Sequence, residues 1–124
     1  MEQNFSNWLP LRELRVADFP NCGDCCAVYA LRDCRSSEII KFGQTDTLRR
    51  RIFGNFVGGI GGHGGSSTTQ FVHQRLFCNS MIDHVEISWI VTKDKTTAKL
   101  MENQFRQSYK TAHDGHRPLW DRNG

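Results

Sequence analysis

A tyrosine, a lysine, a run of arginines and a late glutamate are the residues of this sequence whose chemistry suits a phosphate ester. Cleavage of a phosphodiester requires a positioned water, a cation near the phosphate oxygens and stabilisation of the departing alkoxide. An arginine from the run at 49–51 could offer paired donors to phosphate oxygens, and Glu102 could offer the hard oxygen ligand that Mg²⁺ prefers. Tyr29 could orient or deprotonate the water, provided that a cation such as Lys41 lies beside it and favours the phenolate.

Composition sets the broad class of the protein. The chain of 124 residues has the size of one domain, and it contains no apolar run long enough to cross a membrane. Residues 1–20 lack the continuous apolar segment of a secretory signal, so a cytoplasmic location is expected. Five cysteines, an odd number, then predict reduced thiols. The net charge of +3 permits a polyanionic partner without demonstrating one.

Two apolar runs predict a β-hairpin behind an N-terminal lead-in. Residues 1–24 are expected to pack as a lead-in on a domain of residues 25–124. The runs Cys26–Leu31 and Glu38–Gly43 are separated by a cluster of turn-forming residues.

The alternation of side chains in strands predicts how Tyr29 and Lys41 meet. Tyr29 should share a face with Ala27 and Leu31, and Lys41 should share one with Ile39 and Gly43. If the hairpin pairs these two faces, the phenol and the ammonium lie side by side.

The rest of the chain predicts three helices and a strand. Leu48, Ile52 and Phe56 recur at four-residue spacing behind Thr45, a possible helix cap, and a glycine-rich loop at 57–65 precedes a second helical stretch at 67–77. Alternation over residues 85–91 predicts a half-buried strand. The final helix is indicated by a stripe of apolar residues, namely Ala98, Met101, Phe105 and Tyr109. The order β-β-α-α-β-α indicates a mixed α/β (α+β) fold.

Two tripeptides and the sequence that follows them carry a family resemblance. Ala27-Val28-Tyr29 lies in the first predicted strand, and Lys41-Phe42-Gly43 lies in the second. Gln44-Thr45, a polar turn, Leu48 and then Arg49-Arg50-Arg51-Ile52 follow. This order resembles the GIY-YIG nuclease family, in which the second tripeptide continues as Gly-(Gln/Lys)-x-x-x-Leu-x-x-Arg-Leu. The similarity spans about residues 26–123.

The resemblance implies a fold, an activity and a set of site residues. The implied fold is a small three-stranded antiparallel sheet flanked by helices. The implied activity is hydrolysis of phosphodiester bonds in DNA with one bound Mg²⁺ or Mn²⁺. The family's arginine lies eight residues after the glycine, which selects Arg51, and its late glutamate corresponds to Glu102, the metal ligand. The family's late asparagine corresponds weakly to Asn123.

Other residues near these positions keep simpler interpretations. The helical wheel does not separate Arg49 from Arg51, and Arg49 and Arg50, with Lys41, are expected to contact the DNA backbone or solvent. Glu102 lies about 40° from Ala98 on the predicted helix, so a salt bridge to an arginine is the alternative to a metal.

The sequence also departs from the family pattern. Neither tripeptide matches literally, and Lys41 stands where the family has its second tyrosine. Asn55 stands where the family often has a histidine, for which His63 or His73 are the possible substitutes.

These departures leave two rival functions open. The first is a nucleic-acid-binding module of the same fold with weakened catalysis. The second is a zinc-stabilised interaction domain, in which Cys22 and Cys25 would combine with His113 and His116. DNA specificity is expected to come from the glycine-rich loop, the surface helices or a protein partner, and the sequence leaves open whether the chain forms a homo-oligomer.

Overall fold

An antiparallel sheet with helices on both faces forms the protein. The computed structural model describes residues 4–20, 25–57, 67–77 and 79–120. The sheet has four strands in the order β1-β4-β2-β3, namely β1 Leu9–Pro10, β2 Ala27–Asp33, β3 Glu38–Thr45 and β4 Val85–Val91. The predicted mixed α/β class is therefore confirmed. The sheet has one strand more than the three expected, because Leu9 and Pro10 of the lead-in pair with Ile87 and Glu86 of β4.

Strands β2 and β3 pair in a register that places Tyr29 and Lys41 on the same face of the sheet. Tyr29 pairs with Gly43, and Leu31 pairs with Lys41. Paired residues point to the same face of a sheet, so Tyr29 and Lys41 share a face, as expected. The register then shifts, because Arg32 pairs with Ile39 and leaves Ile40 as an extra residue in β3. The expectation that Ile39 shares the face of Lys41 is therefore wrong.

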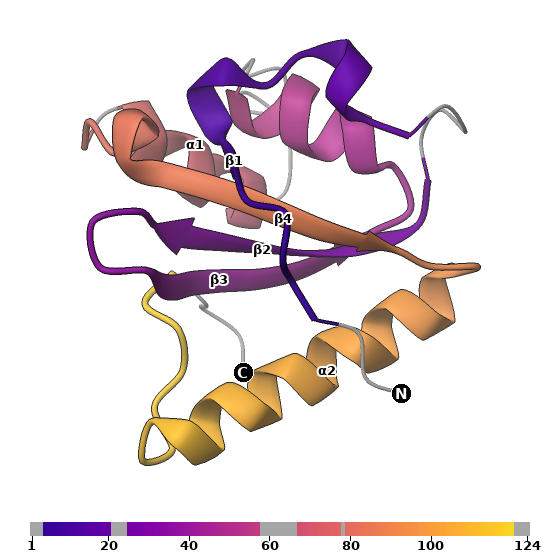
Figure 1. Ribbon diagram of the computed structural model, residues 1–124, viewed down its shortest axis with the longest axis vertical. Helices are drawn as coiled ribbons and strands as arrows, with labels where there is room; N and C mark the ends of the chain where they lie inside the picture. The colour runs from indigo at the N-terminus through magenta and orange to yellow at the C-terminus, as the bar shows by residue number, and fades with distance from the viewer. Residues whose placement is uncertain (1–3, 21–24, 58–66, 78, 121–124) are drawn as a thin grey trace.

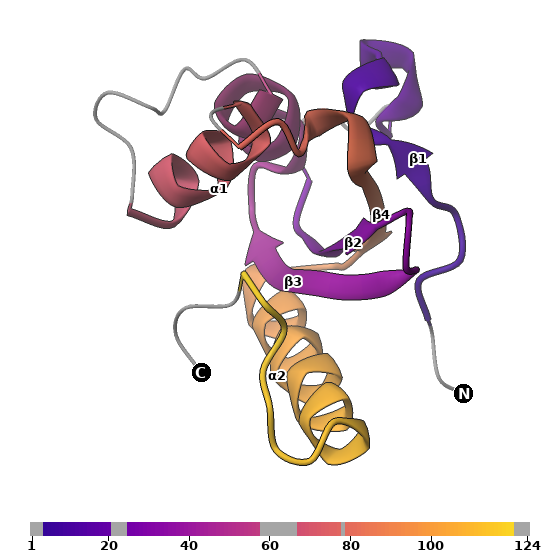
Figure 2. The ribbon, with the colours of Figure 1, turned by 90° about the vertical axis from the view of Figure 1, so that its left-hand side faces the viewer.

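Different elements cover the two faces of the sheet (Figures 1 and 2). The face that carries Tyr29, which we call the α1 face, packs against the 3-10 turn η1 (Leu11–Glu13), the π-helical segment η3 (Arg50–Val57) and helix α1 (Ser67–Phe77). The opposite face, which we call the α2 face, packs against helix α2 (Lys95–Ala112). Phe42 on this face stacks on Phe105 with ring centroids 5.9 Å apart.

Local hydrogen bonds explain where the helices begin. Thr45 is the last residue of β3, and its Oγ1 accepts a hydrogen bond from the Thr47 backbone N–H at 3.0 Å. The first helical hydrogen bond runs from the Arg51 N–H to the Thr47 carbonyl at 2.8 Å, so Thr45 precedes the helix and the prediction that it caps the helix is wrong. Asp94 caps α2 by accepting from the Thr97 backbone N–H at 2.7 Å. The first helix is π-helical over Arg50–Val57, rather than the α-helix that the spacing predicted. Among the helices of the described ranges, none is both long and apolar enough to cross a bilayer.

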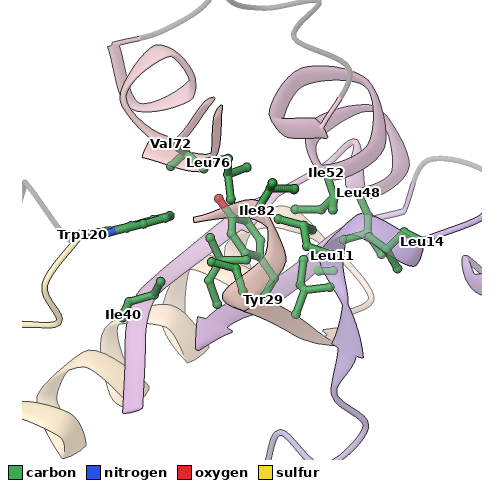
Figure 3. Packing of buried hydrophobic residues seen from close by; sticks show 14 of the residues in the cluster. Leu11, Leu14, Tyr29, Ile40, Leu48, Ile52, Val72, Leu76, Ile82 and Trp120 are labelled. Atoms are coloured by element: carbon green, nitrogen blue, oxygen red, sulfur yellow. The ribbon is translucent and has the colours of Figure 1, made fainter. Parts of the chain in front are cut away.

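Both ends of the described chain contribute to one core (Figure 3). Leu11 and Leu14 of the lead-in and Trp120 of the C-terminal segment join buried residues of β2, η3 and α1. The lead-in is therefore part of the packing of the domain. The side chain of Phe56 and most of the glycine-rich stretch at 57–65 lie outside the described residues.

The cysteines differ from the expectation. Cys25 is disulfide-bonded, whereas Cys26 and Cys34 are free thiols. The prediction that all cysteines are reduced is therefore wrong for Cys25.

Candidate active site

Tyr29 is a buried residue whose ring crosses the edge strand of the sheet. Its exposed fraction is 2%. A Cβ atom placed on Gly43 would lie 2.2 Å from Cζ and 2.3 Å from the hydroxyl oxygen of Tyr29. The outer end of the ring therefore occupies the space above Gly43 in β3, and the hydroxyl end points toward Leu76 of α1 (Figure 3). Glycine at position 43 is what allows the phenol to lie there.

Lys41 lies on the same face, one pair further along the hairpin. It pairs with Leu31, which makes it the diagonal neighbour of Tyr29. Diagonal neighbours on one face of a sheet are within reach of a long side chain. Its exposed fraction of 6% is low for a lysine, so its ammonium group is held within the protein rather than in bulk water. This arrangement meets the geometric condition for a cation beside the phenol.

The arginine run divides according to exposure. Leu48 and Ile52 are fully buried and fix which side of the helical segment faces the core. Arg49 and Arg50 are exposed, whereas Arg51 is partly buried and its Nε atom is inaccessible to solvent. The wheel could not separate these residues, but packing turns Arg51 toward the body of the protein and leaves its neighbours facing solvent.

Glu102 on α2 leans into the protein and pairs with a neighbouring arginine. Its side chain is 16% exposed, and its Oε2 lies 3.5 Å from Nη2 of Arg106, whose side chain is 12% exposed. The alternative interpretation, a salt bridge to an arginine one turn away, is thus present in the structure. A cation already balances this carboxylate, so a metal ion would have to compete with it or join it.

The direction of α2 places Glu102 level with the end of β3. Figure 1 shows α2 running opposite to β3 beneath the sheet. Phe42 contacts both Phe105 and Tyr109, so it lies level with the turn between them. Glu102 precedes the middle of that turn by about 7.5 Å along the helix axis. Gln44 follows Phe42 by about 6.6 Å along the strand, in the matching direction.

Helix phase shows which side of α2 carries the carboxylate. At about 100° per residue, Glu102, Arg106 and His113 lie on the same side of α2 relative to Ala98. His113 Nε2 lies 3.5 Å from Oε2 of Glu38 in β3, so this is the β3 side. We infer that Glu102 from the α2 face and Tyr29 from the α1 face approach the same stretch of edge strand, at Gly43 and Gln44.

Gln44 adds a buried oxygen at this edge. It pairs with Val28 and shares the α2 face with Phe42. Its Oε1 is inaccessible to solvent and has no hydrogen-bond partner. A divalent cation that prefers oxygen ligands fits such a donor set, a carboxylate and an unpaired amide oxygen, with water completing the shell. In the described parts of the chain, no three His, Cys, Asp or Glu side chains lie close enough together to hold a metal ion. The site at this edge has a single glutamate as its charged ligand, so it does not require such a group.

Two of the expected site residues lie outside the described part of the chain. Asn123 and His63 fall in the ranges left out, and the side chain of Asn55 is also outside the description.

His73 lies on α1 and packs against Phe77, with ring centroids 4.7 Å apart and the rings tilted by 46°. Phe71, on the opposite flank of α1, faces Trp120, whose backbone N–H bonds to the Ile40 carbonyl of β3. His73 is therefore turned away from the edge of β3.

Sequence reasoning missed three residues around this edge. Gln44 belongs to the motif but has no role in it, Arg106 follows Glu102 by one helical turn, and Arg75 lies over the Phe71 ring at 4.6 Å, on the β3 side of α1. The signal for Arg106 was its i,i+4 spacing from Glu102.

Tyr109, the other tyrosine of the sequence, is a packing residue. Its ring stacks on His113 with centroids 3.7 Å apart and meets the edge of Phe42. Burial, together with the nearby charge of Glu38, raises its pKa, which makes it a poor source of phenolate.

The zinc alternative loses one of its ligands. Cys25 is disulfide-bonded, and a metal ligand must be a free thiolate. Both ring nitrogens of His113 have neighbours in the protein, because Nδ1 lies 2.7 Å from the Tyr109 carbonyl oxygen and Nε2 lies 3.5 Å from Oε2 of Glu38.

Comparison of the chain with protein-family models, with curated proteins and with solved structures finds no significant match. The GIY-YIG resemblance therefore rests on the motifs, and the function that follows from it is a proposal.

The contact between Tyr29 and Gly43 predicts a strong coupling between these positions. Gly43→Ala should lower the free energy of unfolding by about 1–3 kcal/mol, because the new methyl group overlaps the ring. Adding Tyr29→Ala should make Gly43→Ala nearly neutral, since the space is then empty. Urea unfolding of the double-mutant cycle measures the coupling. Additive effects of the two substitutions would show that the ring does not lie over Gly43.

Proposed function

We propose that this protein is a metal-dependent endonuclease of the GIY-YIG type that hydrolyses phosphodiester bonds in DNA. The observation that carries the proposal is the edge of β3 at Gly43 and Gln44. The phenol of Tyr29 lies over it on one face, and helix geometry brings Glu102 to it on the other. The helical segment η3, which carries Arg51, follows this strand after a short connection. A cytoplasmic location belongs to the same proposal.

Each residue has a role that its position allows. Tyr29 is too buried to touch a DNA backbone directly, so it acts on a water molecule, which is small enough to reach the hydroxyl. Lys41 beside it favours the phenolate form, which accepts the water's proton. Arg51 donates to the oxygens of the scissile phosphate as their charge grows.

Glu102 would hold the divalent ion, which supplies positive charge to the phosphate and to the leaving oxygen when bound. Arg106, whose Nη2 lies 3.5 Å from Oε2 of Glu102, balances the charge of this carboxylate. The exposed Arg49 and Arg50 are available to the DNA backbone and account for part of the net charge of +3.

A nucleic-acid-binding module with weakened catalysis is the second candidate. The 2% exposure of Tyr29 favours it, because a catalytic phenol must reach its water. The pair of Glu102 with Arg106 favours it as well, because a carboxylate that is already balanced binds a metal less strongly. A cleavage assay on plasmid DNA with Mg²⁺ or Mn²⁺ separates the two candidates, since both would bind DNA and the nuclease alone would cut it.

Cleavage should need a divalent metal and the carboxylate of Glu102. Glu102→Gln keeps the shape of the side chain and removes its charge, so the metal-dependent rate should fall by about a hundredfold or more. Plasmid nicking at saturating Mg²⁺ measures the effect, with Glu13→Gln at an exposed glutamate as the matched control. Undiminished cleavage by Glu102→Gln, or full activity in excess chelator, would exclude this role.

Substitution of Arg51 should affect the turnover rate, whereas substitution of Arg50 should affect DNA binding. Arg51→Ala should reduce the turnover rate by about a hundredfold with little change in DNA affinity, because a contact made to the transition state acts on rate rather than on binding. Arg50→Ala should leave the turnover rate almost unchanged and weaken DNA binding slightly. Single-turnover kinetics and fluorescence anisotropy report the two quantities. The assignment of Arg51 is wrong if Arg50 proves essential and Arg51 dispensable.

Lys41 should set the pH range of the reaction. Lys41→Met removes the cation beside the phenol, so cleavage near neutral pH should fall and the alkaline rise of the rate should move to higher pH. Tyr29→Phe should remove the rate at every pH. The measurement is the pH-rate profile at saturating metal, with unfolding curves to show that both variants remain folded. An unchanged profile for Lys41→Met would mean that Lys41 has no part in activating the phenol.

A further inference from the structure

We propose that Gln44 supplies a second protein oxygen to the cation site anchored by Glu102. This inference rests on the proposed nuclease function, which requires the metal, and it assigns a ligand that the family resemblance does not. The donor is Oε1 of the Gln44 amide, which is buried and has no hydrogen-bond partner. The amide contributes an oxygen to the site without contributing a charge.

The unpaired state of this oxygen needs a cause. A buried acceptor without a partner loses its hydration and gains nothing in return, so folded proteins pair almost all such groups. An apolar residue of similar size would fit this position at lower cost. A ligand that pairs with this oxygen when it binds would explain why a glutamine stands at this position.

The position of Gln44 points to a cation as that ligand. Gln44 lies on the α2 face, level with Glu102, and Glu102 is on the side of α2 that faces β3. Carboxylate and amide oxygens are both ligands of Mg²⁺, Mn²⁺ and Ca²⁺. A basic ligand would need a carboxylate partner, and Glu102 is the acidic group of α2 on this side, already paired with Arg106.

The neutral amide also suits the charges around it. Arg106 lies 3.5 Å from Glu102 and remains near the site when the ion binds. A divalent ion with one carboxylate and one arginine is electrostatically less favoured than an ion with two carboxylates. Weak binding of the free ion and stronger binding in the presence of DNA phosphate therefore follow from this donor set.

The test measures metal binding directly in the full chain. Mn²⁺ binding by calorimetry and by electron paramagnetic resonance is compared for the unchanged protein and for Gln44→Met, Gln44→Glu, Glu102→Gln and Gln104→Met. Gln104 is an exposed glutamine on α2 and provides the matched control. Gln44→Met should weaken Mn²⁺ binding about tenfold. Gln44→Glu should strengthen it, and Gln104→Met should not change it.

A stability measurement separates a ligand role from a packing role. Without metal, Gln44→Met should be at least as stable to urea as the unchanged protein, because it removes the unpaired buried oxygen. Loss of metal affinity without loss of stability is the expected combination. If Gln44→Met fails to fold, Gln44→Glu decides, since it keeps the size of the side chain and should bind Mn²⁺ more tightly.

The outcomes distinguish this inference from the proposed function. If the unchanged protein binds Mn²⁺, Glu102→Gln abolishes binding and the Gln44 variants bind as before, the Gln44 inference is overturned and the metal site at Glu102 stands. If the Gln44 variants alter binding as expected and the protein cuts no DNA, the ligand assignment stands and the nuclease function fails. If the unchanged protein binds no Mn²⁺ either alone or together with a DNA duplex, both are overturned.

Discussion

The packing of the Tyr29 ring across Gly43 is the contact on which the candidate site depends. A Cβ atom at position 43 would overlap the ring, so the hairpin can hold this phenol because the opposite residue has no side chain. The same pairing sets the register that puts Lys41 opposite Leu31. A slip by one residue would send either side chain to the other face of the sheet. The register of the hairpin therefore fixes the positions of the phenol and the ammonium together, and neither can change without the other.

The elements with a regular spacing of apolar residues were predictable from the sequence, whereas the short strand β1 and the extra residue in β3 were not. Strand β4 occupies the predicted residues 85–91, because its alternation reflects one face packed more tightly than the other. The two-residue strand β1 is too short to carry a period, and it forms because the edge of β4 is available to it. The extra residue Ile40 reverses the face of Ile39, and an insertion of this kind leaves no mark in a period-two pattern.

The candidate site was predictable where its residues lie in one local pattern. Spacing after Gly43 selected Arg51, and the structure separates this residue from its neighbours, because Arg51 is partly buried whereas Arg49 and Arg50 are exposed. Gln44 and Arg106 escaped notice because their relation to Glu102 depends on how α2 packs against β3. No sequence period records the alignment of two antiparallel elements that are distant in the chain.

The charged groups near the edge of β3 lose hydration when the protein folds, and this loss costs free energy. Lys41 is almost fully buried, and the side chains of Glu102 and Arg106 are 16% and 12% exposed, whereas those of the pair Arg32 and Glu86 are 26% and 21% exposed. Burying ionic groups costs desolvation, which apolar residues of similar volume would avoid. Folded proteins break such rules mainly where a site requires it. A buried lysine, a partly buried pair of glutamate and arginine and an unpaired amide oxygen along one strand edge are therefore together a stronger reason to propose a function there than any single motif residue.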